Sequence, residues 1–211
     1  MSYTYWWSLV VVLLLSACAG PQTRTPVKDP RVAWQQRQDS LAALTHWRIE
    51  GSVSIKSPQE RASLGLDWRQ AADDYDVRFV GPFGKGAVRL LRKGSKVTFY
   101  QPSRPILVSS NVENLLSEEV GWAPPVSQFK LWLKGTVEKY AVPALDPYGR
   151  VLRFHHDGWT IEYKEYQQAL GLELPKRIDL SHQATNIRVV IKQWHRSSIA
   201  KPSKKRFSIP E

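Results

Sequence analysis

The chain has 211 residues, a formal net charge of +11 at pH 7 and a single Cys. One Cys excludes a disulfide framework and a metal site built from several thiolates. The length fits one domain with a hydrophobic core, and the positive charge favours anionic headgroups or acidic partners. Nucleic acid is the other usual partner of a basic chain, but we exclude it because the N-terminal residues indicate export.

The first residues have the features of an export signal. The apolar run from Trp6 to Leu15 is too short to cross a bilayer but has the length of a signal-peptide core. It ends in Leu-Ser-Ala-Cys at residues 15–18, which resembles the bacterial lipoprotein box. The resemblance implies a signal peptide over residues 1–17 and acylation of Cys18, and Ala19 in the next position implies the outer membrane. The alternatives are an ordinary secretory signal with an incidental Cys and an uncleaved anchor.

Between the signal and the first strand we expect a tether and a helix. Residues 18–30 are rich in Pro, Thr and Gln and have no apolar periodicity, which predicts a flexible tether. Residues 31–195 form the predicted folded domain. It begins with a helix over residues 31–45, because Trp34 and Leu41 recur at a helical spacing.

Five consecutive strands are predicted between residues 47 and 101. In each of them large apolar side chains alternate with polar ones, as in the order Trp47, Arg48, Ile49, Glu50. Such alternation indicates antiparallel strands that bury one face. The inward positions of these strands include Trp47, Ile49, Val53, Ile55, Leu64, Leu66, Trp68, Val77, Phe79, Val88, Leu90, Val97 and Phe99.

The loop between the third and fourth of these strands spans residues 81–86 with the sequence Gly-Pro-Phe-Gly-Lys-Gly. Its Phe83 is a large aromatic residue at the middle of a turn, where polar residues are usual. The Gly-Lys pair is too short a motif for a phosphate-binding loop and lacks the following Ser or Thr. This apolar loop tip therefore needs a function other than phosphate binding.

Two short helices are predicted to interrupt the sheet after residue 101. The first begins at a capping box formed by Ser110 and Glu113 and ends at Gly121. The second covers residues 125–133, and its apolar face is formed by Val126, Phe129, Trp132 and Leu133.

Strands resume after the helices, and a basic tail ends the chain. Asp157-Gly158 predicts a two-residue hairpin turn, which the alternating residues Trp159, Ile161 and Tyr163 follow. The remaining strands are expected over residues 150–156, 177–182 and 186–191. Residues 196–211 combine Lys and Arg with Pro and Ser, and we favour a disordered, solvated tail over one that binds anionic lipid.

The sequence offers little that an enzyme needs. His155, His156 and Asp157 are consecutive, but neighbouring residues of a strand point to opposite faces, and Asp157 belongs to the turn. Neither a Gly-x-Ser-x-Gly nor a His-Glu-x-x-His motif is present. We therefore expect no catalysis, no metal and no cofactor.

The aromatic residues allow two interpretations. Trp47, Trp68 and Trp159 occupy inward strand positions, and Trp132 lies on the apolar face of a helix. They either fill an ordinary core or line a space between a one-layer curved sheet and the few short helices that cover it. Such an apolar space would suit an acyl chain.

The order of these features resembles the LolB family, whose members receive lipoproteins at the outer membrane. The resemblance covers about residues 34–194. It is carried by the Cys18 box, Gly51, Trp68, Gly81-Pro82-Phe83-Gly84, Gly121, Pro124-Pro125, Phe129, Trp132-Leu133, Gly135, Asp157-Gly158-Trp159, Tyr163, Leu174-Pro175 and Trp194. It implies a mainly β fold with helices, in which an unclosed antiparallel β half-barrel holds an apolar cavity covered by short α-helices.

The resemblance also implies a function and partners. The chain would accept acylated lipoproteins from a LolA-like periplasmic carrier and insert them into the phospholipid of the outer membrane, as a monomer and without a cofactor. Its membrane-insertion loop would be formed by Gly81, Pro82, Phe83 and Gly84. Its acyl-binding cavity would be lined by the inward residues of the five strands given above together with Phe129, Trp132, Leu133, Trp159, Ile161 and Tyr163.

Two other hypotheses stay open. A scaffold lipoprotein would bind a protein partner on its sheet and enclose no lipid. A soluble LolA-like carrier would have a similar fold, but Cys18 argues against it because a carrier must leave the membrane. A deep apolar cavity below the helices would favour the receptor, whereas a closed and well-packed interior would favour the scaffold.

Overall fold

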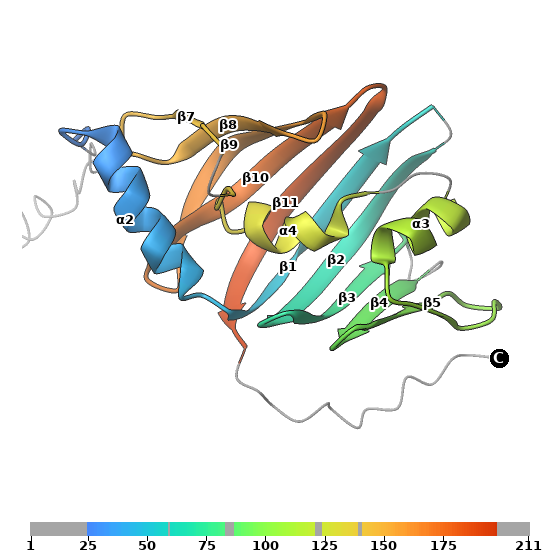
Figure 1. Ribbon diagram of the computed structural model, residues 1–211. Coiled ribbons are helices and arrows are strands. Elements are labelled where there is room, and N and C mark those ends of the chain that lie inside the picture. Colours follow the sequence, from blue (N-terminus) through green and yellow to red (C-terminus); the bar gives the residue numbers. More distant parts are fainter. Residues whose placement is uncertain (1–24, 59, 83–86, 121–123, 139–140, 198–211) are drawn as a thin grey trace, which may run out of the picture.

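The computed structural model describes residues 25–58, 60–82, 87–120, 124–138 and 141–197, which form one antiparallel sheet with three helices on one of its faces (Figure 1). The strands are β1 (His46–Lys56), β2 (Arg61–Ala71), β3 (Asp74–Val80), β4 (Val88–Lys93), β5 (Lys96–Tyr100), β6 (Leu107–Ser109), β7 (Ala144–Leu145), β8 (Val151–His156), β9 (Trp159–Ala169), β10 (Leu172–His182) and β11 (Thr185–Arg196). The helices are α2 (Pro30–Ala42), α3 (Val112–Val120) and α4 (Val126–Trp132).

The order of the strands in space is β6-β5-β4-β3-β2-β1-β11-β10-β9-β8-β7. Two runs of consecutive strands therefore meet where β1 pairs with β11, and α3 and α4 lie in the connection between the runs. The sheet does not close, because β6 and β7 are its two edges. These edge strands have three and two residues and are too short to show alternation in the sequence. The predicted fold class, an unclosed antiparallel sheet covered by short helices, is confirmed.

Every strand predicted from alternation is present, although several extend beyond the predicted bounds. β9 continues to Ala169 and β10 starts at Leu172, so Pro175 lies inside a strand, where the pairing register with β9 shifts. β11 continues to Arg196, the first residue of the predicted tail. Asp157 and Gly158 have φ angles of 45° and 78°, as a two-residue hairpin of this type requires.

Helix α2 begins one residue earlier than predicted. The side chain of Asp29 accepts a hydrogen bond of 2.8 Å from the backbone N–H of Arg31, and Pro30 occupies the first helical position. Before the cap, the backbone N–H of Val27 donates to the carbonyl of Pro147 at 3.0 Å. The described end of the predicted tether is therefore bound to the folded domain.

Helix α3 is capped by Asn111, so the prediction of a capping box at Ser110 is wrong. The Asn111 side chain accepts a hydrogen bond of 2.9 Å from the backbone N–H of Asn114. Asn is as good a cap as Ser, and spacing alone does not separate two adjacent candidates. Glu113 instead accepts a 3.0 Å hydrogen bond from the backbone N–H of Ser127, which ties α3 to the first turn of α4.

The inner face of the sheet, on which the helices pack, is apolar from β11 to β6. One row of directly paired residues consists of Trp194, Ile49, Trp68, Val77, Leu90, Phe99 and Leu107. All of them except Leu107 are buried. Alternation within each strand and antiparallel register between strands together produce this continuous surface.

Gly51 lies where the pairing of β1 with β11 shifts register. A Cβ atom added to Gly51 would lie 2.1 Å from the carbonyl oxygen of Val190, which is far inside contact distance. Only glycine allows the two backbones to approach this closely. The close pairing of β1 with β11 therefore requires glycine at position 51.

The outer face carries charged residues in cross-strand ion pairs. Arg48 donates two hydrogen bonds of 2.9 Å to Asp67, and Arg89 donates bonds of 2.7 and 2.9 Å to Asp76. Burial alone would raise the pKa of Asp76, but Arg89 and Arg78 lower it overall. These pairs keep the outer face polar and leave the apolar surface to the inner face.

Candidate functional site

Helix α4 crosses the inner face of the sheet (Figure 1). Its Trp132 is 1% exposed, and the centroid of its ring lies 5.6 Å from that of Phe129 and 5.9 Å from that of Phe154 on β8. The hydroxyl of Tyr163 on β9 donates a 2.8 Å hydrogen bond to the backbone carbonyl of Trp132. Strands β8 and β9 therefore hold the C-terminal end of α4.

Lys134, which follows α4, connects this helix to α2. Its side chain is buried, and its Nζ donates to the carbonyls of Leu41 at 3.0 Å and Leu44 at 3.2 Å. A cation in this position complements the dipole of α2 at its C-terminal end. Burial, with Lys130 nearby, lowers the pKa of Lys134. The C-terminal end of α4 is therefore fixed to the sheet and to a second helix.

The remaining polar contact of α4 with the sheet is on the surface. Lys130 pairs with Asp73 in the turn between β2 and β3 at 2.5 Å, and 76% of the Asp73 side chain is exposed. Exposed ion pairs contribute little to stability. Lys130 lies in the last turn of α4, so these polar contacts are all near its C-terminal end, whereas its first turn is held by Glu113 of α3.

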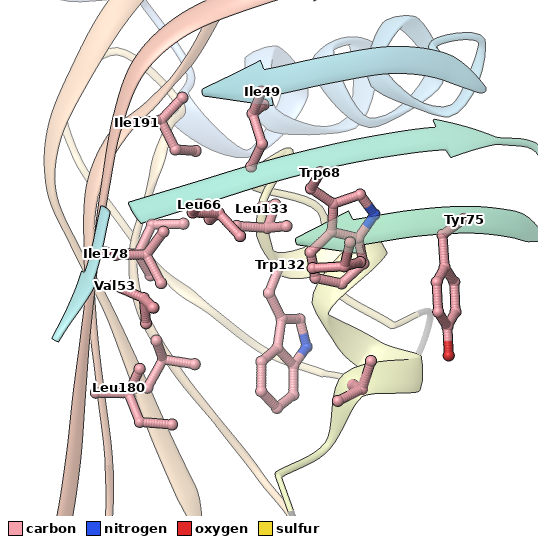
Figure 2. Packing of buried hydrophobic residues seen from close by; sticks show 14 of the residues in the cluster. Ile49, Val53, Leu66, Trp68, Tyr75, Trp132, Leu133, Ile178, Leu180 and Ile191 are labelled. Carbon is pink, nitrogen blue, oxygen red and sulfur yellow. The ribbon is translucent and has the colours of Figure 1, made fainter. Parts of the chain in front are cut away.

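All the residues predicted to line a cavity belong to one apolar cluster. The buried members are Trp47, Ile49, Val53, Leu66, Trp68, Val77, Leu90, Val97, Phe99, Trp132, Leu133, Trp159, Ile161 and Tyr163. The half-buried members are Ile55, Leu64, Phe79, Val88 and Phe129. Figure 2 shows Trp132 and Leu133 directed from the cover towards the inner face of the strands. Because these side chains pack against one another, a ligand would enter only by displacing the covering helices.

The half-buried residues of β1 to β4 gather at one end of the sheet. Ile55 lies near the end of β1 and Phe79 near the end of β3, whereas Leu64 and Val88 lie near the starts of β2 and β4. Farther along the same strands the inward apolar residues are buried. The inner face is therefore least covered at this apolar rim.

The predicted insertion loop starts at the same rim. Gly81 is half-buried and Pro82 is exposed. Phe83 and Gly84 lie outside the described residues. The described base of the loop thus continues the apolar rim into solvent.

Three polar groups inside the apolar cluster are absent from the predicted site. Gln70 is 2% exposed, accepts a 2.8 Å hydrogen bond from Nε1 of Trp68 and donates one of 2.7 Å to the carbonyl of Ala72. The hydroxyl of Tyr75 and Nε1 of Trp132 are buried and have no hydrogen-bond partner among the described residues. Gln70 and Tyr75 continue the alternation of β2 and β3, which is the signal that could have found them.

A hollow of about 370 Å³ lies at one end of β1, β10 and β11. Its lining consists of Ser54, Ile55, Lys56, Glu162, Asp179, Leu180, Ser181, Asn186, Ile187 and Arg188. None of these residues belongs to α2, α3 or α4, and several are charged. Ile55 is also a predicted cavity residue, but the rest of the lining does not belong to that predicted set, so the hollow is not the predicted space below the helices.

Other features of the site concern His residues, metals and the membrane. His155 is exposed, whereas His156 is half-buried with its ring centroid 5.6 Å from that of Trp132, so the two point to opposite faces as predicted. Among the described residues no three His, Cys, Asp or Glu side chains are placed to hold a metal ion. None of the described helices has the length and apolar character needed to cross a membrane.

Cys18, the predicted site of acylation, lies outside the described residues, so its acylation stays a prediction.

Comparison with known proteins identifies the family to which this chain belongs. The family model described as "LolB: Outer membrane lipoprotein LolB" matches residues 45–194. The chain belongs to the LolB family of outer-membrane lipoproteins. Outer-membrane lipoprotein LolB of Nitrosococcus oceani is 32% identical over 190 residues, which are 88% of this chain and 94% of that protein. The LolB of Pseudomonas fluorescens is 34% identical over 187 residues, 87% of this chain and 91% of the relative.

A solved structure supports the fold independently. The crystal structure of a LolA superfamily protein from Nitrosomonas europaea matches with a TM-score of 0.51 and covers 84% of this chain and 96% of that one. Its sequence identity of 10% limits the likeness to the fold. The unclosed sheet under short helices is therefore common to this LolB-family chain and a LolA superfamily protein.

Several residues that carry the resemblance to LolB contact one another. Nε1 of Trp194 donates a 3.2 Å hydrogen bond to the carbonyl of Pro175. Gly135 has a φ of 79°, and a Cβ atom there would lie 3.3 Å from Cγ of Pro175. Tyr163 and Trp132 form the hydrogen bond described above. Residues that are far apart in the LolB sequence therefore meet where α4 joins the second run of strands.

Proposed function

We propose that this LolB-family protein accepts acylated lipoproteins from a LolA-like periplasmic carrier and delivers them into the outer membrane. The observation that carries the proposal is the inner face: a continuous apolar surface under short helices, least covered at one rim. The polar outer face offers acyl chains no comparable surface. Binding and delivery on this scheme require no bond to be made or broken, so we propose no catalytic role.

The energy of the cargo explains why such a protein is needed. A lipoprotein with three acyl chains of about sixteen carbons has on the order of 35 kcal/mol of transfer free energy, at ~0.8 kcal/mol per methylene. Spontaneous transfer through water is negligible against this barrier. An apolar interior lets the chains pass from carrier to receptor to bilayer without full hydration. Direction then follows from affinity, with the carrier weaker than the receptor and the receptor weaker than the membrane.

The acyl-binding residues of the proposal are the predicted inward strand residues and the helix residues Phe129, Trp132 and Leu133. In the packed conformation they contact one another, which taken alone is the interior expected of a scaffold. Membership of the LolB family favours the receptor, in which acyl chains replace these contacts when the covering helices move. Tyr163 and Lys134 hold the C-terminal end of α4 to the sheet and to α2, whereas its first turn is held by Glu113 of α3, so α3 and the first turn of α4 would move together. The cargo therefore enters below the first turn of α4.

The loop that begins at Gly81 is proposed to act in delivery. An apolar residue such as Phe83 contributes only about 1.5–3 kcal/mol when it enters a bilayer, which is too little to anchor the protein. It is enough to disturb lipid packing next to the apolar rim. Anchoring belongs to the acyl chains on Cys18, and we propose that the protein acts as a monomer with outer-membrane phospholipid as its target.

The first test is transfer from a loaded carrier. Protein lacking residues 1–18 is mixed with a LolA-like carrier that holds a labelled lipoprotein, and the label is followed by pull-down. We expect the label to move to this protein. A carrier that keeps its cargo here, although it releases it to an authentic LolB, would contradict the proposal and favour the scaffold hypothesis.

A further inference from the structure

The polar groups of the interior aromatic residues are paired, with few exceptions. Trp68 donates to Gln70, Trp194 to the carbonyl of Pro175, and Tyr166 to the carbonyl of Val151 at 2.7 Å. Three buried aromatic donors have no partner among the described residues: Nε1 of Trp132, the hydroxyl of Tyr75 and Nε1 of Trp34. The Trp132 and Tyr75 side chains are only 1% and 5% exposed. Each is thus a buried donor with nothing to donate to.

Two of these three donors, those of Trp132 and Tyr75, lie at helix α4, whereas Trp34 belongs to α2. Trp132 belongs to α4, and the Tyr75 ring centroid lies 5.8 Å from that of Trp68, which is itself 6.5 Å from that of Phe129 on α4. In Figure 2 Trp68 lies between Tyr75 and Trp132. The two donors therefore flank the surface on which we place the acyl chains.

Leaving a buried donor unpaired costs free energy, and such groups call for a physical explanation. Replacement of Tyr by Phe, or of the indole by a phenyl ring, would remove the cost and keep an apolar surface. A ligand that supplies an acceptor when it binds accounts for both groups. The surroundings of Trp132, which include Phe129 and Phe154, are apolar, so the same ligand must present hydrocarbon next to its acceptor.

The chemistry of the donors limits the ligand further. Indole N–H donates only, and burial, opposed by Arg92 and reinforced by Glu113, raises the pKa of Tyr75 to about 12. Tyr75 therefore stays a neutral O–H donor at any physiological pH. An acyl-glyceryl group matches such donors, because its ester carbonyls accept hydrogen bonds and it carries hydrocarbon on both sides.

We propose that Nε1 of Trp132 and the hydroxyl of Tyr75 donate hydrogen bonds to the ester carbonyls of the acyl-glyceryl group of bound cargo. The inference rests on the proposed receptor function and deepens it. Apolar contacts alone would let an acyl chain slide along the binding surface. Two fixed donors would instead fix the position of the ester groups from which the chains extend. The pair thus selects ester-linked lipid over plain hydrocarbon.

The test compares two probes: a diacylglyceryl-cysteine lipopeptide and the same lipopeptide with dialkyl ether links, which offer much weaker acceptors. Binding of each is measured by displacement of a labelled lipoprotein. We expect Tyr75→Phe to weaken binding of the ester probe about five-fold and to leave the ether probe unchanged. Trp132→Phe also removes apolar ring surface, so it should weaken both probes, and the ester probe about five-fold more than the ether probe. Tyr166→Phe is the matched control, because its hydroxyl already has a partner, and the ratio of ester to ether affinity should stay as in the wild type.

A second measurement keeps the test independent of folding. Because the Tyr75 hydroxyl is unpaired, Tyr75→Phe should not lower the melting temperature of the empty protein, whereas Tyr166→Phe should. Equal losses for ester and ether probes in Tyr75→Phe, or a lowered melting temperature in that variant, would overturn the inference and leave the receptor function standing. Failure of the wild type to bind either probe would instead overturn the receptor function itself.

Discussion

Tyr163 and Trp132 are joined by a 2.8 Å hydrogen bond from a strand hydroxyl to the last carbonyl of a covering helix. Burial raises the pKa of Tyr163 well above its ordinary value, so its hydroxyl keeps its proton and the bond persists over the physiological range. The bond holds the C-terminal end of α4, where the exposed ion pair of Lys130 with Asp73 also lies. The first turn of α4 is instead hydrogen-bonded to Glu113 of α3.

Tyr163→Phe should therefore loosen the cover. We expect the free energy of unfolding to fall by about 1 kcal/mol, because the buried Trp132 carbonyl loses one of its two donors and keeps the backbone N–H of Gly135. Amide hydrogen exchange in α4 should become faster by more than the global change explains. Tyr166→Phe removes a comparable bond to Val151 and serves as the control, since it should leave exchange in α4 at the global rate. Identical exchange patterns in the two variants would contradict this role of Tyr163.

Gly51→Ala should damage the fold severely. The added methyl group would meet the Val190 carbonyl at 2.1 Å, and we expect a loss of about 3 kcal/mol or non-productive folding. Gly65→Ala is the matched control, because its added Cβ atom would meet the carbonyl of Val80 only at 3.5 Å. Chemical denaturation of both variants gives the comparison, and a tolerated Gly51→Ala would show that the junction of β1 and β11 can relax.

Phe83→Glu should separate uptake of cargo from delivery. The charged side chain cannot enter lipid, so we expect transfer to liposomes to fall by about ten-fold or more while uptake from the carrier is unchanged. Phe83→Leu keeps an apolar tip and should transfer like the wild type. Normal delivery by the Glu variant would remove the loop from the mechanism.

The ion pair of Asp76 with Arg89 should give a pH-dependent contribution to stability. Arg89 and Arg78 together lower the pKa of Asp76 despite its burial, so the contribution is present above the ordinary pKa of an aspartate and is lost as the pH falls through the lowered value. We expect Asp76→Asn to cost about 1 kcal/mol near neutral pH. Urea unfolding over a pH series checks this: the difference from the wild type should shrink towards zero in acid and not towards alkaline pH.

The intrinsic fluorescence of the protein should respond to bound acyl chains. Trp47, Trp68, Trp132 and Trp159 are all buried in the apolar cluster, and cargo that displaces the cover must change their surroundings. We expect a shift in emission on addition of a lipopeptide and none with the deacylated peptide. An unchanged spectrum under saturating lipopeptide would mean that these residues only fill the core.

The individual strands could be predicted from the sequence, but the pairing between distant strands could not. Alternation located the long strands and their inward residues because each strand buries one face, and the Asp157-Gly158 turn follows from its two residues alone. The pairing of β1 with β11 has no local signature, since it joins the ends of the domain. The register shift at Gly51 exists only because of that pairing. The sequence alone therefore does not show why residue 51 must be glycine.

The hydrogen bonds of the site could not be predicted from the sequence either, because they too depend on tertiary contacts. Glu113 has the spacing of a capping box, yet it bonds to Ser127 because α4 folds back beside α3. Trp132 reads as an apolar helix residue, and only its packed surroundings show that its N–H lacks a partner. The prediction for Phe83 rests on the opposite signal, an aromatic residue where a turn should be polar, and it stays a prediction.

The junction of β1 with β11 also bears on how the protein is made. Residues 46–56 cannot complete their pairing until residues 185–196 have been synthesised, so the first strand run emerges without one of its neighbours. Non-local pairing of this kind slows folding. The sheet therefore cannot be completed until the last strand of the domain is available. A chain that folds late in this way is suited to being transported before it folds.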